Sequence, residues 1–189
     1  MLKNNNREIE TKLLVSDLPT ITKKIIAVGG ILVQPEFFQR TVRFDTSDEK
    51  LKKEKISLRV RTGDKDVITL KKRIDGHKRE KEGLKEREEL ETEVEDIAEI
   101  RQILINLGFT REWIMEKYRT NYKLGEAVIS LDRLPFGCFV EVEGEPEEIE
   151  SVIQKLELLE VERSAQSYWG LFEEFKKKTN LTVENILFE

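Results

Sequence analysis

Charged and apolar side chains alternate along most of the segments of this chain that have the composition of β-strands. In residues 7–15, Glu8, Glu10 and Lys12 fall on one face of an extended chain, and the other face is mainly apolar. An alternation of period two is typical of a strand that separates two different environments. The same pattern returns, with turn signals between the segments, in residues 56–62, 67–74, 85–94, 109–124 and 138–143.

Two arrangements of a sheet satisfy this alternation. In the ordinary one, an antiparallel sheet turns its charged face to solvent, and for each strand taken alone that interpretation is the simpler one. In the other, the sheet closes into a barrel and turns its charged faces inward. Amphipathic helices favour the second arrangement, because their apolar stripes need an apolar sheet face to cover. We therefore predict an α+β fold, a closed antiparallel β-barrel with a charged interior and helices packed outside, the helices lying within residues 17–28, 97–107, 146–156 and 168–178.

The two halves of the chain resemble each other in their order of elements. Each half begins with a strand that carries two carboxylates, Glu8 and Glu10 in the first half and Glu89 and Glu91 in the second. An amphipathic helix, a long extended segment and a hairpin with alternating charges follow in both halves. This order indicates a duplicated strand–helix–meander unit, and two such units could pair into one barrel.

Composition excludes several classes of protein. The chain has 189 residues, of which 38% are charged, but 33 basic side chains nearly balance 38 acidic ones, so nucleic acid is not an expected partner. The length suits one domain over residues 1–189, with a core at about 7–175 and a tail at 176–189. Cys138 is the only cysteine, and no apolar run approaches about 18 residues, so we expect a cytoplasmic protein without a membrane segment.

Charges of both signs on inward faces would suit a polyphosphate together with its metal ion. Carboxylates supply the hard oxygen ligands that Mg²⁺ or Mn²⁺ prefers, and the candidates are Glu8, Glu10, Glu141, Glu143 and Asp132. Lysine and arginine supply donors for phosphate oxygens, and arginine can bind two at once. The basic candidates are Lys12, Arg59, Arg61, Lys71, Arg73, Arg87, Lys117 and Arg119.

These residues form an ordered series that resembles a known family. The series is Glu8-x-Glu10-x-Lys12, Phe44-Asp45, Leu58-Arg59-x-Arg61, Thr69-Leu70-Lys71, Arg87-x-Glu89-x-Glu91, Lys117-x-Arg119, Asp132, Gly137-x-Phe139-x-Glu141-x-Glu143 and Ser167-Tyr168. It resembles the CYTH superfamily, the triphosphate tunnel metalloenzymes, which includes class IV adenylyl cyclases and thiamine triphosphatases. The resemblance implies a tunnel of eight antiparallel strands. A Tyr-Phe-Asp triplet that is usual in the family is replaced here by Arg43-Phe44-Asp45.

The resemblance also implies roles for single residues. The metal would be held by Glu8, Glu10, Asp132, Glu141 and Glu143, and Glu91 could serve the metal or its basic neighbours. The triphosphate would be held by Lys12, Arg59, Arg61, Lys71 and Arg119, with Arg73, Arg87, Lys117 and Arg163 as further candidates.

We expect a metal-dependent enzyme that hydrolyses a triphosphate, with Lys12, Glu10 and Glu143 as the catalytic residues. The substrate would be tripolyphosphate, thiamine triphosphate or a nucleoside triphosphate, and the protein a monomer or homodimer. Water activated by a carboxylate or by Lys12 would attack the terminal phosphorus. One alternative is a class IV adenylyl cyclase, which converts ATP to cyclic AMP and pyrophosphate. A second alternative is a module that binds polyphosphate or nucleotide without catalysis.

Overall fold

The computed structural model describes residues 6–74 and 83–189. In chain order its elements are β1 (Arg7–Val15), α1 (Leu18–Ala27), β2 (Ile31–Asp45), α2 (Lys50–Lys53), β3 (Ile56–Thr62), β4 (Val67–Arg73), β5 (Lys85–Glu93), α3 (Ile97–Asn106), β6 (Arg111–Leu124), β7 (Ala127–Leu134), β8 (Gly137–Glu143), α4 (Pro146–Lys155), β9 (Arg163–Ser164) and α5 (Tyr168–Thr179).

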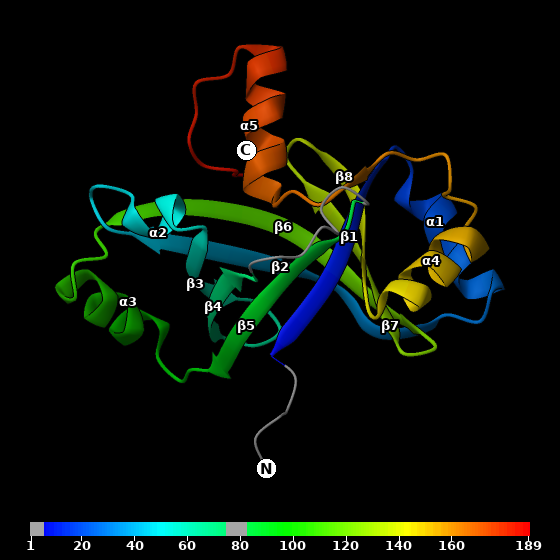
Figure 1. The fold of residues 1–189 in the computed structure, drawn as a ribbon, viewed down its shortest axis with the longest axis horizontal. Coiled ribbons are helices and arrows are strands. Elements are labelled where there is room, and N and C mark those ends of the chain that lie inside the picture. The colour runs from blue at the N-terminus through cyan, green and yellow to red at the C-terminus, as the bar shows by residue number, and fades with distance from the viewer. Residues whose placement is uncertain (1–5, 75–82) are drawn as a thin grey trace.

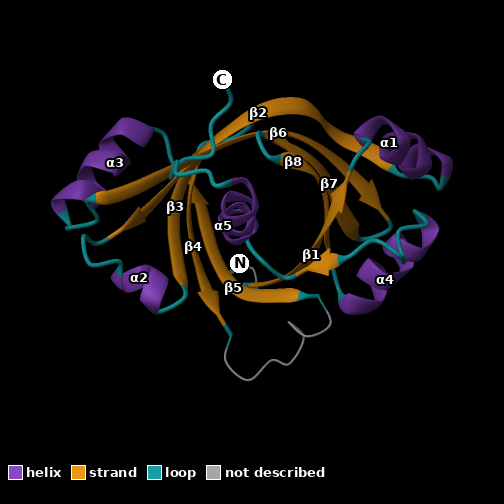
Figure 2. Cartoon of the chain, turned by 90° about the horizontal axis from the view of Figure 1, so that it is seen from above, coloured by secondary structure: helices purple, strands orange, loops and turns teal. Residues whose placement is uncertain are grey.

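Eight antiparallel strands form a closed ring. Their order is β5-β4-β3-β2-β6-β7-β8-β1, and β1 pairs again with β5, so that the sheet returns on itself. The two-residue strand β9 adds to β1. Figures 1 and 2 show the ring from two directions, with α1 and α4 at one side and α2 and α3 at the other. The predicted closed antiparallel β-barrel is confirmed.

Local signals in the sequence set the helix ends. Asp17 and Asp96 precede α1 and α3, and each carboxylate accepts a hydrogen bond from the backbone N–H three residues later. Helix α4 begins at Pro146, and Glu148 closes a capping box with Glu145. These contacts satisfy N–H groups that a helix leaves unpaired in its first turn.

The apolar faces of the strands point away from the ring's interior. Ile9 and Leu13 of β1 pack in a buried cluster with Ile25 of α1 and Ile153 of α4. A second cluster joins strands β2 and β3 to α3 through Phe44, Leu58, Val60 and Leu104. Because alternate residues point to opposite faces, this packing directs the charged side chains into the lumen. The inward arrangement of charges is therefore correct.

Helix α5 lies over one opening of the ring, as the view from above in Figure 2 shows. The chain after it returns to the sheet. Ile186 exchanges backbone hydrogen bonds with β6, accepting from the N–H of Glu116 (2.8 Å) and donating to the carbonyl of Ile114 (2.9 Å). Among the residues described, no helix is both long and apolar enough to span a membrane.

Candidate active site

A cavity of about 950 Å³ runs through the ring and is lined mainly by charged side chains. Its lining brings together residues that are far apart in the sequence and come from β1, β3, β4, β5, β6 and β8. Of the predicted site residues, it includes Glu8, Glu10, Lys12, Arg59, Arg61, Lys71, Arg73, Arg87, Glu91, Lys117, Arg119, Glu141, Glu143 and Arg163.

One side of the cavity is an acidic wall, formed by Glu8 and Glu10 of β1 and Glu141 and Glu143 of β8. The two strands are antiparallel neighbours, and their register places Glu10 opposite Glu143. Lys12, only 3% exposed, lies between Glu10 (2.6 Å) and Glu141 (2.9 Å). Burial alone would lower the pKa of Lys12, but the two carboxylates outweigh it and raise the pKa. Lys12 is therefore an ammonium ion at neutral pH and not a base.

Two more lysines contact the acidic wall. The Nζ atom of Lys71 lies 2.5 and 2.6 Å from the two oxygens of Glu8, and the Nζ atom of Lys85 lies 2.6 Å from Glu10. The pKa of Glu8 is raised by burial and by Glu10, against the effect of Lys71. Lys85 is absent from the predicted site. Its place in the alternation with Arg87 could have revealed it.

Glu143 differs from the rest of the acidic wall. It is exposed to the cavity, and among the described residues it has no hydrogen-bond or ion-pair partner. Partial desolvation by the surrounding protein atoms, and repulsion from the negative charges of Glu8, Glu141 and Glu10, raise the pKa of Glu143 to about 7. A carboxylate that is crowded by three others fits a site for a divalent cation, because the cation would relieve the repulsion.

The acidic wall is not, however, a ready-made metal centre. Within residues 6–74 and 83–189, no three His, Cys, Asp or Glu side chains already stand in a metal-binding arrangement. The ammonium group of Lys12 occupies the space between Glu10 and Glu141. The donor set fits Mg²⁺ or Mn²⁺ by its chemistry, and binding would require these side chains to move apart or rotate.

The rest of the lining includes a basic wall, formed by Arg59 and Arg61 of β3, Lys71 and Arg73 of β4, Arg87 of β5, and Lys117 and Arg119 of β6. It meets the acidic wall where Lys71 contacts Glu8 and where Arg119 contacts Glu141 at 2.8 Å. Arg59 lies 3.6 Å from Glu89, and Arg61 lies 3.2 Å from Glu91. The Nε atoms of both arginines are buried and, among the described residues, have no acceptor. Buried donors without acceptors cost free energy, so an anionic ligand would stabilise them.

Glu91 belongs to this wall and not to the acidic one. Besides its pair with Arg61, its carboxylate accepts a hydrogen bond from the Thr69 hydroxyl at 2.9 Å. The geometry therefore favours Glu91 as an ion-pair partner of its basic neighbours. This is one of the two roles that the sequence left open for Glu91.

Asp132 of β7 is fully buried and does not line the cavity. Its oxygens accept hydrogen bonds from Lys117 (3.0 Å), Arg119 (2.6 and 2.5 Å) and the Tyr168 hydroxyl (2.6 Å). These are the contacts of a residue that positions cations, so the geometry does not favour Asp132 as a metal ligand. Burial and the neighbouring Arg119 lower the pKa of Lys117 to about 7, although Asp132 opposes them.

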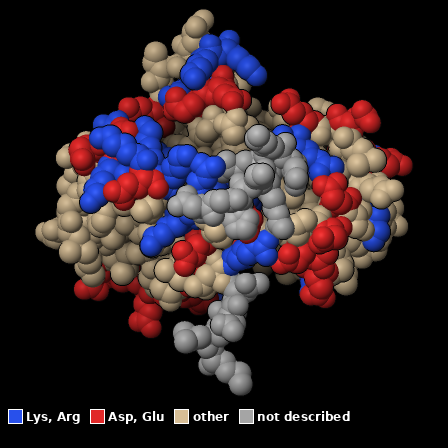
Figure 3. Space-filling view, viewed as in Figure 1, with Lys and Arg blue, Asp and Glu red and all other residues tan. Residues whose placement is uncertain are grey.

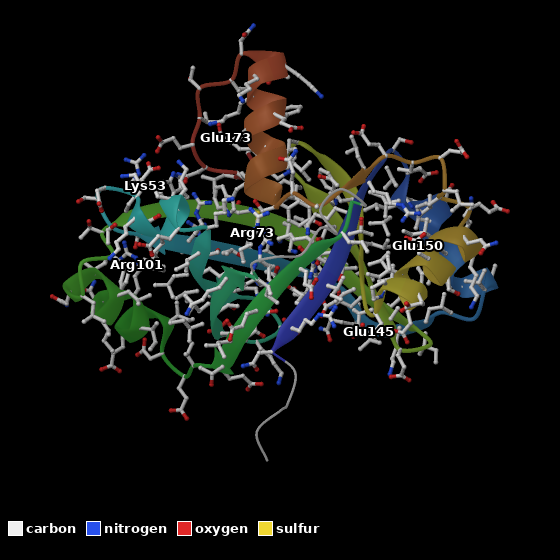
Figure 4. The ribbon with its side chains drawn as sticks, viewed as in Figure 1. Lys53, Arg73, Arg101, Glu145, Glu150 and Glu173 are labelled. Carbon is white, nitrogen blue, oxygen red and sulfur yellow. The ribbon has the colours of Figure 1, made fainter. Side chains whose placement is uncertain are left out.

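Arg163 is one of the lining residues, but its guanidinium is paired with a carboxylate of helix α4. It forms a two-pronged ion pair with Glu150, with one contact of 2.9 Å. Figure 4 shows Glu150 beside the outer helix α4, well apart from Arg73. Arg73 lies directly opposite Arg87 in the pairing of β4 with β5, and both line the cavity. The structure thus brings Arg73 and Arg87 together at the cavity, whereas the side chain of Arg163 is paired with Glu150, which does not line the cavity.

The fold and the site together define a class of protein: a closed ring of antiparallel strands whose lumen carries an acidic wall and a basic wall. The sequence pattern of the CYTH domain matches residues 6–168. The chain belongs to the CYTH domain family.

Individual relatives agree with this assignment. A protein of Methanocaldococcus jannaschii, provisionally named an adenylate cyclase, is 27% identical over 181 residues, which cover 95% of this chain and 93% of that protein. A solved structure from Pyrococcus horikoshii is 26% identical, covers 89% of this chain and 99% of its own, and superposes with a TM-score of 0.69. A solved Hippeastrum protein, described as a candidate adenylyl cyclase with a dominant triphosphatase activity, has a TM-score of 0.60 at 21% identity, and the match covers 89% of this chain and 96% of that one. At that identity the likeness concerns the fold.

Proposed function

We propose that this protein is a metal-dependent triphosphatase that hydrolyses the terminal phosphoryl group of a triphosphate bound in the tunnel. The observation that carries the proposal is the meeting of the acidic and basic walls in one cavity. A cation or an anion alone would need only one of the two walls. A triphosphate with its divalent cation matches both of them.

The basic wall would bind the phosphate oxygens. Arg59 and Arg61 present buried Nε donors without acceptors, and a guanidinium can donate two parallel hydrogen bonds to one phosphate. Lys12, held as an ammonium ion between Glu10 and Glu141, would add a positive charge from the other side of the cavity. Asp132 would act indirectly, by holding Lys117 and Arg119 in place.

The acidic wall would hold the divalent cation through Glu8, Glu10, Glu141 and Glu143. When bound, Mg²⁺ or Mn²⁺ would neutralise the negative charge that develops on the phosphate oxygens during the reaction. Binding the triphosphate would also draw Lys12 and Lys71 from their carboxylates towards phosphate oxygens, which would free those carboxylates.

Glu143 is the residue that we assign to accept the proton of the attacking water. It is exposed to the cavity and has no cationic partner among the described residues, whereas Lys12 is already protonated. The water oxygen forms a bond to the terminal phosphorus as the bond to the bridging oxygen breaks. The proton goes to Glu143, and the diphosphate leaves from the basic wall.

A second candidate is the cyclisation of ATP, favoured by the name of the relative from Methanocaldococcus jannaschii. There the ribose 3′-hydroxyl would attack the α-phosphorus, and pyrophosphate would leave. A binding module without catalysis is the third candidate. The presence of two carboxylate pairs speaks against it, since binding alone needs mainly the basic wall.

One assay separates the three candidates. The protein is incubated with tripolyphosphate, thiamine triphosphate or ATP, each with Mg²⁺ or Mn²⁺. We expect released inorganic phosphate. Cyclic AMP with pyrophosphate would instead establish the cyclase, and tight binding without turnover the module. Equal activity in EDTA would exclude a metal-dependent reaction.

A further inference from the structure

Strand β6 has an edge that the ring leaves open near helix α5. The strand pairs with β2 from Arg111 to Lys123, but its pairing with β7 begins only at Tyr118. Residues 111–117 therefore have, in the part of the chain that the structure describes, no strand of the ring beside them on the β7 side. Backbone groups along such an edge need other partners. The edge ends at Lys117, which lines the tunnel.

Residues 184–188, which we call the strap, fill this edge. Ile186 makes the two backbone hydrogen bonds to β6 described above, and the side chain of Asn185 accepts a third from the N–H of Ile114 at 2.9 Å. The N–H of Phe188 donates to a carboxylate oxygen of β6 at 3.2 Å. In Figure 1 the strap belongs to the red segment that runs back beside α5 towards β6. The strap therefore takes the place of a neighbouring strand.

Ile186 also packs beneath the base of α5. Its side chain is only 1% exposed and lies in a buried cluster with Met115 of β6 and with Tyr168 and Phe172 of α5. Tyr168 and Phe172 are the buried residues of this helix. Figure 3 shows basic and acidic side chains on the part of the molecule that α5 forms above the ring. The apolar contact of α5 with the ring is therefore concentrated at its base, where the strap contributes to it.

Tyr168 connects the base of α5 to the phosphate site. Its hydroxyl donates to Asp132 at 2.6 Å, and the same carboxylate oxygen accepts from Lys117 at 3.0 Å and from Arg119 at 2.5 Å. The ammonium groups of Lys12 and Lys117 lie 5.1 and 5.2 Å from the centroid of the Tyr168 ring, within the range of cation–π attraction. Tyr168 and Asp132 therefore hold cations that line the tunnel.

The strap reaches Lys117 by two routes. One runs through the backbone of β6, where the strap accepts a hydrogen bond from Glu116, the residue before Lys117. The other runs through Ile186, Tyr168 and Asp132. We propose that the strap is a positioning element of the phosphate site, and that it holds the basic wall in the geometry that binds the triphosphate. Ile186 is its central residue.

The proposal rests on the proposed function, since it places the triphosphate against Lys117 and Arg119. The strap is a feature of this chain beyond the family match, because the CYTH pattern ends at residue 168. The strap acts on the basic wall, so its loss should weaken binding of the triphosphate and leave the chemical step largely intact.

The binding test compares the wild type with a chain truncated after Val183, with Ile186→Ser and with Ile186→Val. Titration calorimetry with tripolyphosphate is done in EDTA, so that a metal-dependent reaction does not consume the ligand. We expect the truncated chain and Ile186→Ser to bind about tenfold or more weakly, because charged hydrogen bonds to phosphate are misplaced. Ile186→Val keeps the backbone bonds and most of the apolar contact, and should bind within about threefold of wild type. A wild-type affinity of the truncated chain or of Ile186→Ser would overturn the proposal.

Leu187→Ser is the matched control. Leu187 is the next residue of the strap, but it is 41% exposed, so we expect wild-type binding. If Leu187→Ser weakens binding as much as Ile186→Ser does, the effect does not come from the buried contact beneath α5, and the proposal is wrong. The apolar clusters beneath α1, α4 and α3 do not include the strap, so the variants should keep the rest of the ring. If the truncated chain does not fold, Ile186→Ser decides the outcome.

Kinetics separates positioning from a general loss of stability. With tripolyphosphate and Mg²⁺, Ile186→Ser should raise KM about tenfold or more and keep kcat within about threefold of wild type. A fall in kcat with an unchanged KM would indicate only a smaller folded fraction, and would overturn the proposal. The binding test needs no turnover. Binding that depends on the strap, without hydrolysis of any triphosphate, would refute the proposed function alone, whereas an active enzyme whose affinity does not depend on the strap would refute this proposal alone.

Discussion

Strands β1 and β5 carry the same sequence pattern, two glutamates separated by one residue, but the structure gives their carboxylates different surroundings. The two strands are paired with each other, and each has a different neighbour on its other side. The neighbour of β1 is β8, which adds Glu141 and Glu143. The neighbour of β5 is β4, which adds Lys71.

This difference divides one charge pattern into two kinds of site. On β1 and β8, four carboxylates lie close to one another, and buried lysines hold them together. This concentration of negative charge would suit a metal ion. On β5, Glu89 and Glu91 each face an arginine of β3, and these pairs orient the donors that would meet phosphate. The neighbouring strand, and not the motif itself, decides which role a Glu-x-Glu pair takes.

The largest effect that we expect is on stability, from Lys12→Met. Lys12 is buried between Glu10 and Glu141, and without it Glu10 keeps Lys85 and Glu141 keeps Arg119 as ion-pair partners. Breaking a buried pair costs about 3–5 kcal/mol, and the remaining partners place this variant towards the lower end of that range. Urea unfolding measures the change. Arg61→Met, at the more open pair with Glu91, should cost less than about 1 kcal/mol, and equal losses would contradict the distinction between the two regions.

The next effect is on turnover, from Glu143→Gln compared with Glu91→Gln. If Glu143 accepts the proton and helps to hold the metal, its amide variant should lower kcat by about 100-fold or more. The fold should be kept, because Glu143 has no partner among the described residues to lose. Glu91→Gln should lower kcat by less than about tenfold. Steady-state kinetics with saturating Mg²⁺ measures kcat for both variants. A larger loss of kcat for Glu91→Gln than for Glu143→Gln would contradict the roles assigned to these two carboxylates.

Arg59→Ala should weaken the binding of the triphosphate without removing catalysis. A hydrogen bond to a charged group contributes about 1.5–3 kcal/mol, and the unpaired Nε of Arg59 is available to make one. Titration calorimetry with tripolyphosphate measures the loss. Arg101→Ala, on the outer helix α3 and paired with Glu112, is the control and should bind as wild type does. A wild-type affinity for Arg59→Ala would remove that residue from the phosphate site.

The smallest effect is a pH dependence of stability in metal-free buffer. The pKa of Glu143 is raised from 4.5 to about 7, so between these values the folded protein holds a proton that the unfolded chain has released. The free energy of unfolding therefore falls as pH rises from 4.5 to 7. Glu143→Gln should reduce this slope in urea unfolding with EDTA. An unchanged slope would show that Glu143 is not crowded by the other carboxylates.

Most of the fold and of the tunnel lining followed from the sequence, for a local reason. Alternation with period two assigns side chains to faces, and the apolar stripes of the amphipathic helices favour the arrangement in which the charged faces point inward, so Glu10, Arg59 and Arg119 could be predicted to line the lumen. The roles of Asp132, Arg163 and Lys85 could not be assigned in this way. Each depends on a partner from another element: Tyr168 for Asp132, Glu150 for Arg163, and Glu10 for Lys85.

The sequence by itself determined which face of each strand is charged, because the geometry of an extended backbone repeats every two residues. Only the tertiary structure decided which charges meet. Closure of the ring joins β1 to β5 and β8, and the packing of α5 over the opening brings Trp169 against Arg43. Coulomb and stacking energies depend on distances between residues far apart in the chain. The same glutamate pattern therefore forms part of the acidic wall on one strand and pairs with arginines on the next.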